Sequence, residues 1–242
     1  MNHPMNKRHF LRGTVLGLGT VLLPWGLKAK DAAGIKPGAK SALIVVDVQN
    51  CFVDGGTLPV ARGAEVVPVI NAMAAKFENI VMTQDWHTQG HASFASSHQG
   101  KKPFETIQLS YGTQVLWPDH CVQGTDDAAL HKDLKLPQAQ VIVRKGYHQH
   151  VDSYSAFLEA DRKTPTGLGG YLKQRGIKEV FVCGLATDFC VAWTALDARS
   201  QGLVTHVIED ACRGIDLNGS VAQAWKNMQA KGIKRIQSRD LV

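Results

Sequence analysis

The chain has 242 residues, of which 44% are hydrophobic and 20% are charged, a composition that excludes a fibrous or largely disordered protein. The formal net charge is +6, but much of the excess lies near the termini and no basic stripe alternates with aromatic residues. A nucleic-acid partner is therefore not predicted. Five cysteines without a CxxC pair exclude a dense disulfide scaffold, and we expect most of them to be buried as small apolar side chains.

The N-terminus has the arrangement of an export signal. Basic Lys7, Arg8 and Arg12 precede an apolar run over residues 14–25 that is too short to span a bilayer comfortably. The segment KRHFLR also resembles the twin-arginine export motif, with Lys7 in the place of the first arginine. We therefore expect residues 1–35 to be a leader with transient membrane contact, and the protein to be periplasmic or otherwise exported. Sec export, an uncleaved membrane anchor and a cytoplasmic protein with an N-terminal appendage are the alternatives.

Residues 40–242 alternate short apolar runs with helical patterns, and we expect them to form one domain. The first run, Ser41 to Asp47, lacks polar alternation, as is typical of a strand buried on both faces. Helices are expected over 64–77 and 187–200. Further strands are expected over 79–83, 140–144, 179–183, 203–208 and, more weakly, 233–237. Strands that alternate with helices predict a three-layer α/β/α fold with a mostly parallel six-stranded sheet.

Polar residues follow the predicted strands at their carboxyl ends, where an open parallel sheet binds its ligands. These residues are Asp47 after the first strand, Asp85 and His87 after the second, Lys145 after the third and Cys190 after the fourth. The loop over 87–136 is too long for a simple connection, so we expect it to contribute to the same site.

Cys190 is a candidate nucleophile. It falls near the first turn of a predicted helix with Thr187 as the expected N-cap, and the unpaired N–H groups there would lower the thiol pKa. A nearby Lys145 would stabilise the thiolate, while Asp47 would take its proton and later pass it to the leaving amine. Core packing is the ordinary explanation for a lone buried cysteine, but it does not account for the charged residues at this edge.

Asp85 and His87 indicate a metal site. They are two residues apart, so an extended backbone points the carboxylate and the imidazole the same way, toward two adjacent positions on a divalent metal. His120 and His91, both in the long loop, are the candidates for a third ligand. This spacing is weak evidence by itself, because histidines in loops are common. Such ligands suit zinc, iron(II) or manganese and do not distinguish between these metals.

Six motifs together resemble the nicotinamidase (pyrazinamidase) family of the isochorismatase-like hydrolase superfamily. They occur in family order from Ser41 to the C-terminus: VDVQNCF, QDWHTQGHASFA, WPDHCVQGT, KGYHQHVDSYSAF, CGLATDFCV and EDACRG. The resemblance implies an isochorismatase-like, Rossmann-like fold. It also implies that the protein hydrolyses nicotinamide, and pyrazinamide, to the acid and ammonia through a cysteine thioester, as a step of NAD salvage.

The resemblance also implies roles for particular residues. The catalytic triad would be Asp47, Lys145 and Cys190. One divalent metal ion would be held by Asp85, His87 and His120, with His91 as an extra ligand or as a group that orients the others.

The substrate would be held by residues from three of the motifs. The resemblance implies that Phe52 and Trp117 hold the pyridine ring and that the amides of Ala186 and Cys190 form the oxyanion hole, after a cis peptide between Leu185 and Ala186.

Two positions depart from the family pattern. Cys51 stands where the family usually has Asp, which adds a second thiol near the site, and Thr88 stands where Pro commonly follows the metal-binding histidine. Neither belongs to the implied triad.

Other functions fit parts of the pattern. A metal-free amidohydrolase or isochorismatase of the same superfamily would not need the Asp and His ligands. A non-haem iron oxygenase would use two histidines and one carboxylate, and an exported metal-binding protein would use them without catalysis. Neither of the last two explains Lys145 or Cys190. A homo-oligomer is compatible with the sequence, which does not fix the number of subunits.

Overall fold

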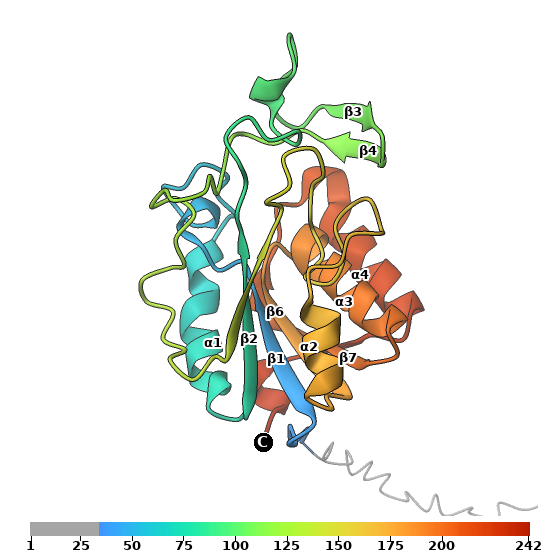
Figure 1. Cartoon of the computed structure of the whole chain (residues 1–242). Helices are drawn as coiled ribbons and strands as arrows, with labels where there is room; N and C mark the ends of the chain where they lie inside the picture. The colour runs from blue at the N-terminus through green and yellow to red at the C-terminus, as the bar shows by residue number, and fades with distance from the viewer. Residues whose placement is uncertain (1–33) are drawn as a thin grey trace, which may run out of the picture. The chain divides into compact units, whose positions relative to one another are not determined.

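The computed structural model of the protein describes residues 34–242, so the predicted leader lies almost wholly outside the described residues. Six strands form one sheet in the order β5-β2-β1-β6-β7-β8, and every pairing in it is parallel (Figure 1). The strands are β1 (Ser41–Val46), β2 (Asn79–Asp85), β5 (Val141–Lys145), β6 (Glu179–Leu185), β7 (Val204–Arg213) and β8 (Lys234–Ile236). The predicted α/β fold with a six-stranded sheet is confirmed.

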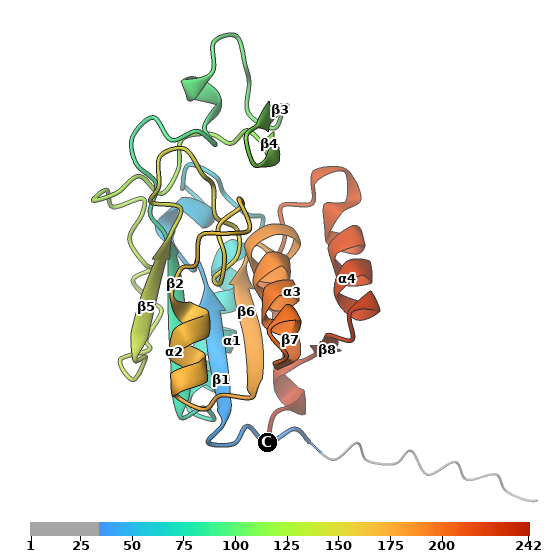
Figure 2. The ribbon, with the colours of Figure 1, turned by 45° about the vertical axis from the view of Figure 1, so that its right-hand side comes forward.

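Helices cover both faces of the sheet. They are α1 (Val66–Ala74), α2 (Leu168–Gln174), α3 (Ala192–Ser200) and α4 (Ser220–Ala230). Helix α1 lies on one face, α2 and α3 lie on the other, and α4 packs against α3 (Figures 1 and 2). The helices α2 and α4 were not predicted. Two glycines weaken the helical signal of α2. Helix α4 does have an apolar face, formed by Val221, Ala224, Trp225 and Met228 at helical spacing, which the sequence analysis overlooked.

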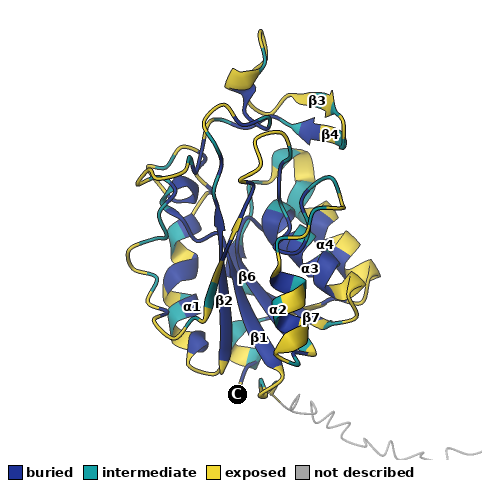
Figure 3. Cartoon of the chain, viewed as in Figure 1, coloured by how far each residue is buried: buried dark blue, intermediate teal, exposed yellow. Residues whose placement is uncertain are grey.

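Strand β1 lies in the middle of the sheet and is buried along its whole length. It pairs with β2 on one side and β6 on the other, which is why its sequence is continuously apolar. Burial is concentrated in the strands and in the inward faces of the helices (Figure 3). Because β5, β2, β1 and β6 are neighbours, the residues at their carboxyl ends meet at one edge of the sheet.

The long loop after β2 lies over this edge. It contains an antiparallel hairpin of β3 (Thr106–Leu109) and β4 (Gly112–Val115), drawn at the top of Figure 1. Two parts of the loop are joined by backbone hydrogen bonds at Trp117. Its backbone N–H donates to the carbonyl of Ser93 at 2.8 Å, and its carbonyl accepts the N–H of Ala95 at 2.8 Å. The loop is therefore an ordered part of the site, as its length suggested.

The two ends of the described chain pair with each other. The Ile35 N–H donates to the Asp240 carbonyl at 2.7 Å, and the Val242 N–H donates to the Ile35 carbonyl at 3.0 Å. The folded unit therefore starts before residue 40, where we placed the start of the domain. No helix within residues 34–242 has the length and apolar character that a membrane span requires.

Gly184 in β6 allows the close pairing of β1 and β6 beside the site. Its φ is +116°, and a Cβ atom there would lie 2.0 Å from the Val46 carbonyl oxygen. We expect Gly184→Ala to lower the free energy of unfolding of residues 34–242 by about 3 kcal/mol, measured by urea titration. Gly170→Ala in α2 is the control, because a Cβ there meets nothing within 4 Å and alanine favours helices. Equal stability of the two variants would contradict this reading of Gly184.

Candidate active site

The buried ammonium group of Lys145 lies at the centre of the site. It is 2.8 Å from Oδ2 of Asp47, contacts Oδ1 of Asp85, donates to the Ser153 carbonyl at 2.9 Å and lies 3.3 Å from Sγ of Cys190. Burial lowers the pKa of Lys145, but the two carboxylates raise it more, and the net pKa is well above the ordinary value. Lys145 therefore stays positively charged between two carboxylates and a thiol.

Asp47 follows β1 in a left-handed backbone conformation, with φ of 47°. Its N–H donates to the hydroxyl oxygen of Thr83 at 3.1 Å, and its Oδ1 accepts the hydroxyl proton of the same residue. Burial raises the pKa of this carboxyl to about 6, against the opposing effect of Lys145. A carboxylate with a pKa in this range can take up and return a proton near neutral pH.

Cys190 lies in a π-helical turn, Thr187–Val191, that leads into α3. The cis peptide between Leu185 and Ala186 precedes this turn, as the family resemblance implied. The N-cap position is Ala186 and no side chain caps the turn, so the predicted capping by Thr187 is wrong. Burial raises the pKa of the Cys190 thiol well above its ordinary value, although Lys145 lowers it. The predicted lowering of the thiol pKa is therefore not confirmed, because burial has the largest effect on this thiol and raises its pKa, so ionisation requires a base.

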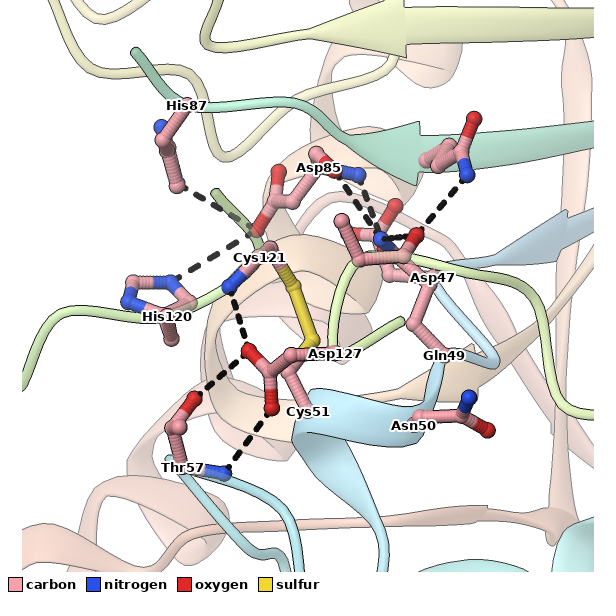
Figure 4. Close-up of a disulfide and its surroundings, with 12 residues drawn as sticks. Asp47, Gln49, Asn50, Cys51, Thr57, Asp85, His87, His120, Cys121 and Asp127 are labelled. Carbon is pink, nitrogen blue, oxygen red and sulfur yellow. Dashed lines mark hydrogen bonds and ion pairs between the residues drawn. A yellow bond between two sulfur atoms is a disulfide. The ribbon is translucent and has the colours of Figure 1, made fainter. Parts of the chain in front are cut away.

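Asp85, His87 and His120 present ligand atoms that all lie within 4.8 Å of one another. Nε2 of His87 is 3.7 Å and Nε2 of His120 is 3.9 Å from Oδ2 of Asp85, and Figure 4 shows the three side chains facing one another. Each Nδ1 lies near a backbone carbonyl, Gly146 for His87 at 2.9 Å and Pro118 for His120 at 2.8 Å. Carbonyl partners place the proton on Nδ1 and leave Nε2 free, which fits a divalent metal ion.

The two histidines differ in their electrostatic surroundings. Burial, followed by the charge of His87, lowers the pKa of His120 to about 4, so this ring is neutral at physiological pH, as a metal ligand must be. Burial lowers the pKa of His87, but the nearby Asp85 carboxylate raises it more, and the net pKa is above the ordinary value. Metal binding at His87 therefore competes with a proton.

His91 lies beside the cluster of Asp85, His87 and His120. Its ring centroid lies 4.4 Å from that of His87, and it also approaches Asp152. However, its Nδ1 pairs with the Ser93 hydroxyl at 2.8 Å and its Nε2 with the His148 carbonyl at 3.0 Å. Both nitrogens are thus engaged by the protein. Of the two candidates for the third ligand, His120 has the nitrogen that faces Asp85.

Gly146 provides the space in which the His87 ring lies. Its φ is +67°, and a Cβ atom at this position would lie 2.5 Å from Cε1 of His87. The same glycine supplies the carbonyl that pairs with Nδ1 of that ring. A side chain at residue 146 would therefore displace one of the candidate metal ligands.

Asp85, His87 and His120 line one small cleft, whereas Asp47 and Lys145 are fully buried and are not among its lining residues. Phe52, Trp117 and Ala186, implied by the resemblance, line it together with Cys190. Residues that the sequence analysis did not single out also line it: Leu58, Asp152, Tyr154, Phe189 and Ile215. The aromatic wall is ordered by contacts of the Trp117 indole, which donates to the Tyr154 hydroxyl at 3.0 Å and packs edge-on against Phe189. Asp152 and Tyr154 fall within a quoted motif, KGYHQHVDSYSAF, whereas no local pattern marks Leu58 or Ile215.

The cysteines divide into two groups. Cys51 and Cys121 form a disulfide with a Cα–Cα distance of 5.7 Å, so Cys51 is not the additional thiol that we expected near the site. Cys183, Cys190 and Cys212 are free and buried. Of these three, Cys190 lines the cleft.

Comparison with known proteins agrees with this geometry. The Isochorismatase domain family matches residues 41–240, which is most of the chain. The chain belongs to the isochorismatase family. Within this family it is 60% identical over 208 residues to a nicotinamidase of Acinetobacter baylyi, covering 86% of this chain and 97% of that one.

Solved structures of the family share the fold. A nicotinamidase/pyrazinamidase of Acinetobacter baumanii is 64% identical with a TM-score of 0.83, over 84% of this chain and 98% of that one. PnC1 of L. infantum in complex with nicotinate is 35% identical with a TM-score of 0.76, over 86% and 98%. The pyrazinamidase of Pyrococcus horikoshii in complex with zinc is 35% identical with a TM-score of 0.67, over 82% and 99%.

The geometry of the histidines generates a prediction. We expect His87→Ala and His120→Ala to lose bound metal to below about a tenth of the wild-type content, because each removes a nitrogen that faces Asp85. His91→Ala should retain most of its metal, since both nitrogens of that ring already have protein partners. Elemental analysis of the purified variants measures this. Equal loss in all three variants would make His91 a ligand.

Proposed function

We propose that the protein is a nicotinamidase, which hydrolyses nicotinamide, and pyrazinamide, to the carboxylic acid and ammonia. The observation that carries the proposal is that one small cleft places the thiol of Cys190 beside Asp85, whose carboxylate belongs to the cluster with His87 and His120. The names of the family relatives and the nicotinate bound in the L. infantum structure support it.

The first half of the reaction uses Asp47 as a base. Its carboxylate takes the proton of the Cys190 thiol, and the thiolate attacks the carboxamide carbon. Lys145, 3.3 Å from the sulfur, stabilises the negative charge throughout. The N–H groups of Ala186 and Cys190 hold the oxyanion of the tetrahedral intermediate. When this intermediate collapses, Asp47 returns its proton to the nitrogen, ammonia leaves and a thioester to Cys190 remains.

The second half repeats the proton transfers with water. Asp47 removes a proton from a water molecule, the resulting hydroxide attacks the thioester carbon, and the carbon–sulfur bond breaks. Asp47 then returns a proton to the sulfur. The acid leaves and the resting thiol is restored, so the protons balance over the cycle.

Recognition of the ring uses the other side of the cleft. Phe52 and Trp117 line the space in which an aromatic ring would lie. Asp85, His87 and His120 would hold a divalent metal ion, which supplies an acceptor for the pyridine nitrogen and so orients the ring. The zinc in the P. horikoshii structure supports a metal at this position, and zinc, iron(II) and manganese all suit these ligands.

Hydrolysis is favoured over the oxygenase that the same three ligands allow, because the family match extends over the segments that carry Asp47, Lys145 and Cys190. Release of ammonia from nicotinamide without consumption of oxygen distinguishes the two. Activity that survives complete removal of metal would instead favour a metal-free amidohydrolase of the superfamily.

Removal of the nucleophile tests the proposal directly. We expect Cys190→Ala to lower ammonia release from nicotinamide by roughly 1,000-fold or more, while metal content and the urea unfolding midpoint stay near wild type. Cys212→Ala, which removes a buried thiol that is absent from the cleft lining, is the matched control. Turnover by Cys190→Ala at the wild-type rate would end the thiol mechanism.

The pH dependence follows from Asp47. Burial raises its pKa to about 6, so as the pH falls through this value the carboxylate gains a proton and can no longer act as a base. We expect kcat/KM to be level above the pKa and to fall about tenfold for each pH unit below it. Metal content is measured at each pH to separate loss of the base from loss of metal. Asp47→Asn should lower turnover and remove the inflection; an unchanged profile in this variant would assign the inflection to another group.

We also propose that the protein is exported. The basic segment and short apolar run near the N-terminus support this, and so does the Cys51–Cys121 disulfide, because disulfides persist in oxidising compartments.

Fractionation of cells that make C-terminally tagged protein should place it outside the cytoplasm, with Lys7→Arg retaining or increasing export. Residues 34–242 made alone should stay in the cytoplasm. A full-length chain in the cytoplasm with its original N-terminus would contradict export.

A further inference from the structure

The Cys51–Cys121 disulfide joins two segments that each carry a residue of the cleft. Cys51 directly precedes Phe52, and Cys121 directly follows His120 (Figure 4). We infer that this bond is a positioning element for the metal site: it holds His120 against Asp85 and His87, so that the oxidised chain binds a divalent metal more tightly than the reduced one. The inference rests on the metal site of the proposed function.

The backbone of Cys121 is linked to both histidines. Its carbonyl accepts the N–H of His87 at 3.1 Å, and its N–H donates to Oδ2 of Asp127 at 2.9 Å. Its φ of 46° is in the left-handed region, which a non-glycine residue adopts only when its surroundings hold it there. A change at Cys121 therefore reaches His120 through the chain and His87 through a hydrogen bond.

The segment of Cys51 is hydrogen-bonded to the backbone of Asp85. Gln49, two residues earlier, donates from Nε2 to the Asp85 carbonyl at 2.9 Å and accepts the Asp85 N–H on Oε1 at 2.8 Å. The Cys51 N–H donates to the Asp127 carbonyl at 2.8 Å, so this short turn also contacts the residue that binds Cys121. The disulfide thus completes a closed link from Asp85 through the turn to His120.

The three ligands differ in what holds them. Asp85 ends β2 and His87 follows two residues later at the start of the long loop, whereas His120 lies far along that loop from the six-stranded sheet. The disulfide closes a sequence separation of 70 residues and limits how far the His120 segment can move from the end of β1. Loss of the bond should therefore act mainly through His120.

The bond has a defined redox balance. Its formation removes two protons and two electrons from the two thiols, and a disulfide oxidant, such as a protein dithiol oxidase or oxidised glutathione, accepts them by thiol–disulfide exchange. Both cysteines are fully buried in the folded chain, which limits the access of reductants once the bond has formed. The state set at folding is thus retained.

The test measures zinc affinity of residues 34–242 by competition with a chromogenic chelator, without substrate. The proteins are the oxidised wild type, the reduced wild type, Cys51→Ser, Cys121→Ser and the double variant. We expect oxidised wild type to contain three alkylatable thiols after denaturation, matching Cys183, Cys190 and Cys212. Each single variant and the reduced protein should bind zinc about tenfold more weakly, and the double variant no more weakly than either single one.

Two controls separate positioning from general loosening. Cys212→Ala should keep the wild-type affinity, because it removes a buried thiol away from the cluster. In a His120→Ala background, reduction should cause no further loss of zinc affinity, since the ligand through which the bond acts is already absent. A further tenfold loss in that background would show that the bond acts on the whole fold and not through His120.

Either of two other results would overturn the inference: five alkylatable thiols in oxidised protein, or equal zinc affinity in the oxidised wild type and the double variant. If a serine variant fails to fold, the comparison of reduced with oxidised wild type, both checked by circular dichroism, decides the question. The test measures zinc affinity and not turnover. A failure to hydrolyse nicotinamide would therefore count against the proposed function, and the effect of the disulfide on zinc affinity could still be interpreted.

Discussion

The buried ammonium group of Lys145 determines the arrangement at the carboxyl edge of the sheet. An ammonium removed from water costs several kcal/mol unless carboxylates compensate it, and Asp47 and Asp85 do so from the two adjacent strands β1 and β2. The two carboxylates can reach Lys145 because the strand order β5-β2-β1-β6 brings the ends of four strands together. The charge in turn lies beside the sulfur of Cys190, in the π-helical turn that follows β6. Folding and chemistry therefore depend on the same ion cluster.

Asp85 divides its two oxygens between two tasks. Oδ1 contacts Lys145, and Oδ2 faces Nε2 of His87 and His120. Burial raises the pKa of this carboxyl, but the charge of Lys145 and the contacts with His87 lower it more, and the net pKa is below the ordinary value. Asp47, with fewer compensating cations, has a raised pKa instead. Two buried carboxylates that share one lysine thus have pKa values shifted in opposite directions, as is found where neighbouring acids take different roles.

The strands and the α/β fold class could be predicted from the sequence because local patterns of apolar residues encode them. Apolar runs indicated the strands of the sheet, most weakly β8, where Lys234 and Arg235 are exposed, and polar residues after the strands indicated the site. Features that depend on tertiary surroundings were not visible in the same way. Burial raises the pKa of Cys190, against the direction expected from a helix start, and a π-helical turn replaces the first turn of the helix expected over 187–200. The pairing of Cys51 with Cys121 joins residues far apart in the chain, which no local pattern specifies.

The pairing of Ile35 with the C-terminal residues has a consequence for anything attached to this enzyme. Both ends of the described chain lie beside the amino end of β1, whereas the cleft lies beyond the carboxyl ends of the strands (Figure 1). A tether joined at Gly34, or a fusion partner joined at Val242, begins on the side of the sheet away from the cleft mouth. The enzyme can therefore be anchored or immobilised by either end with its substrate entrance facing outward.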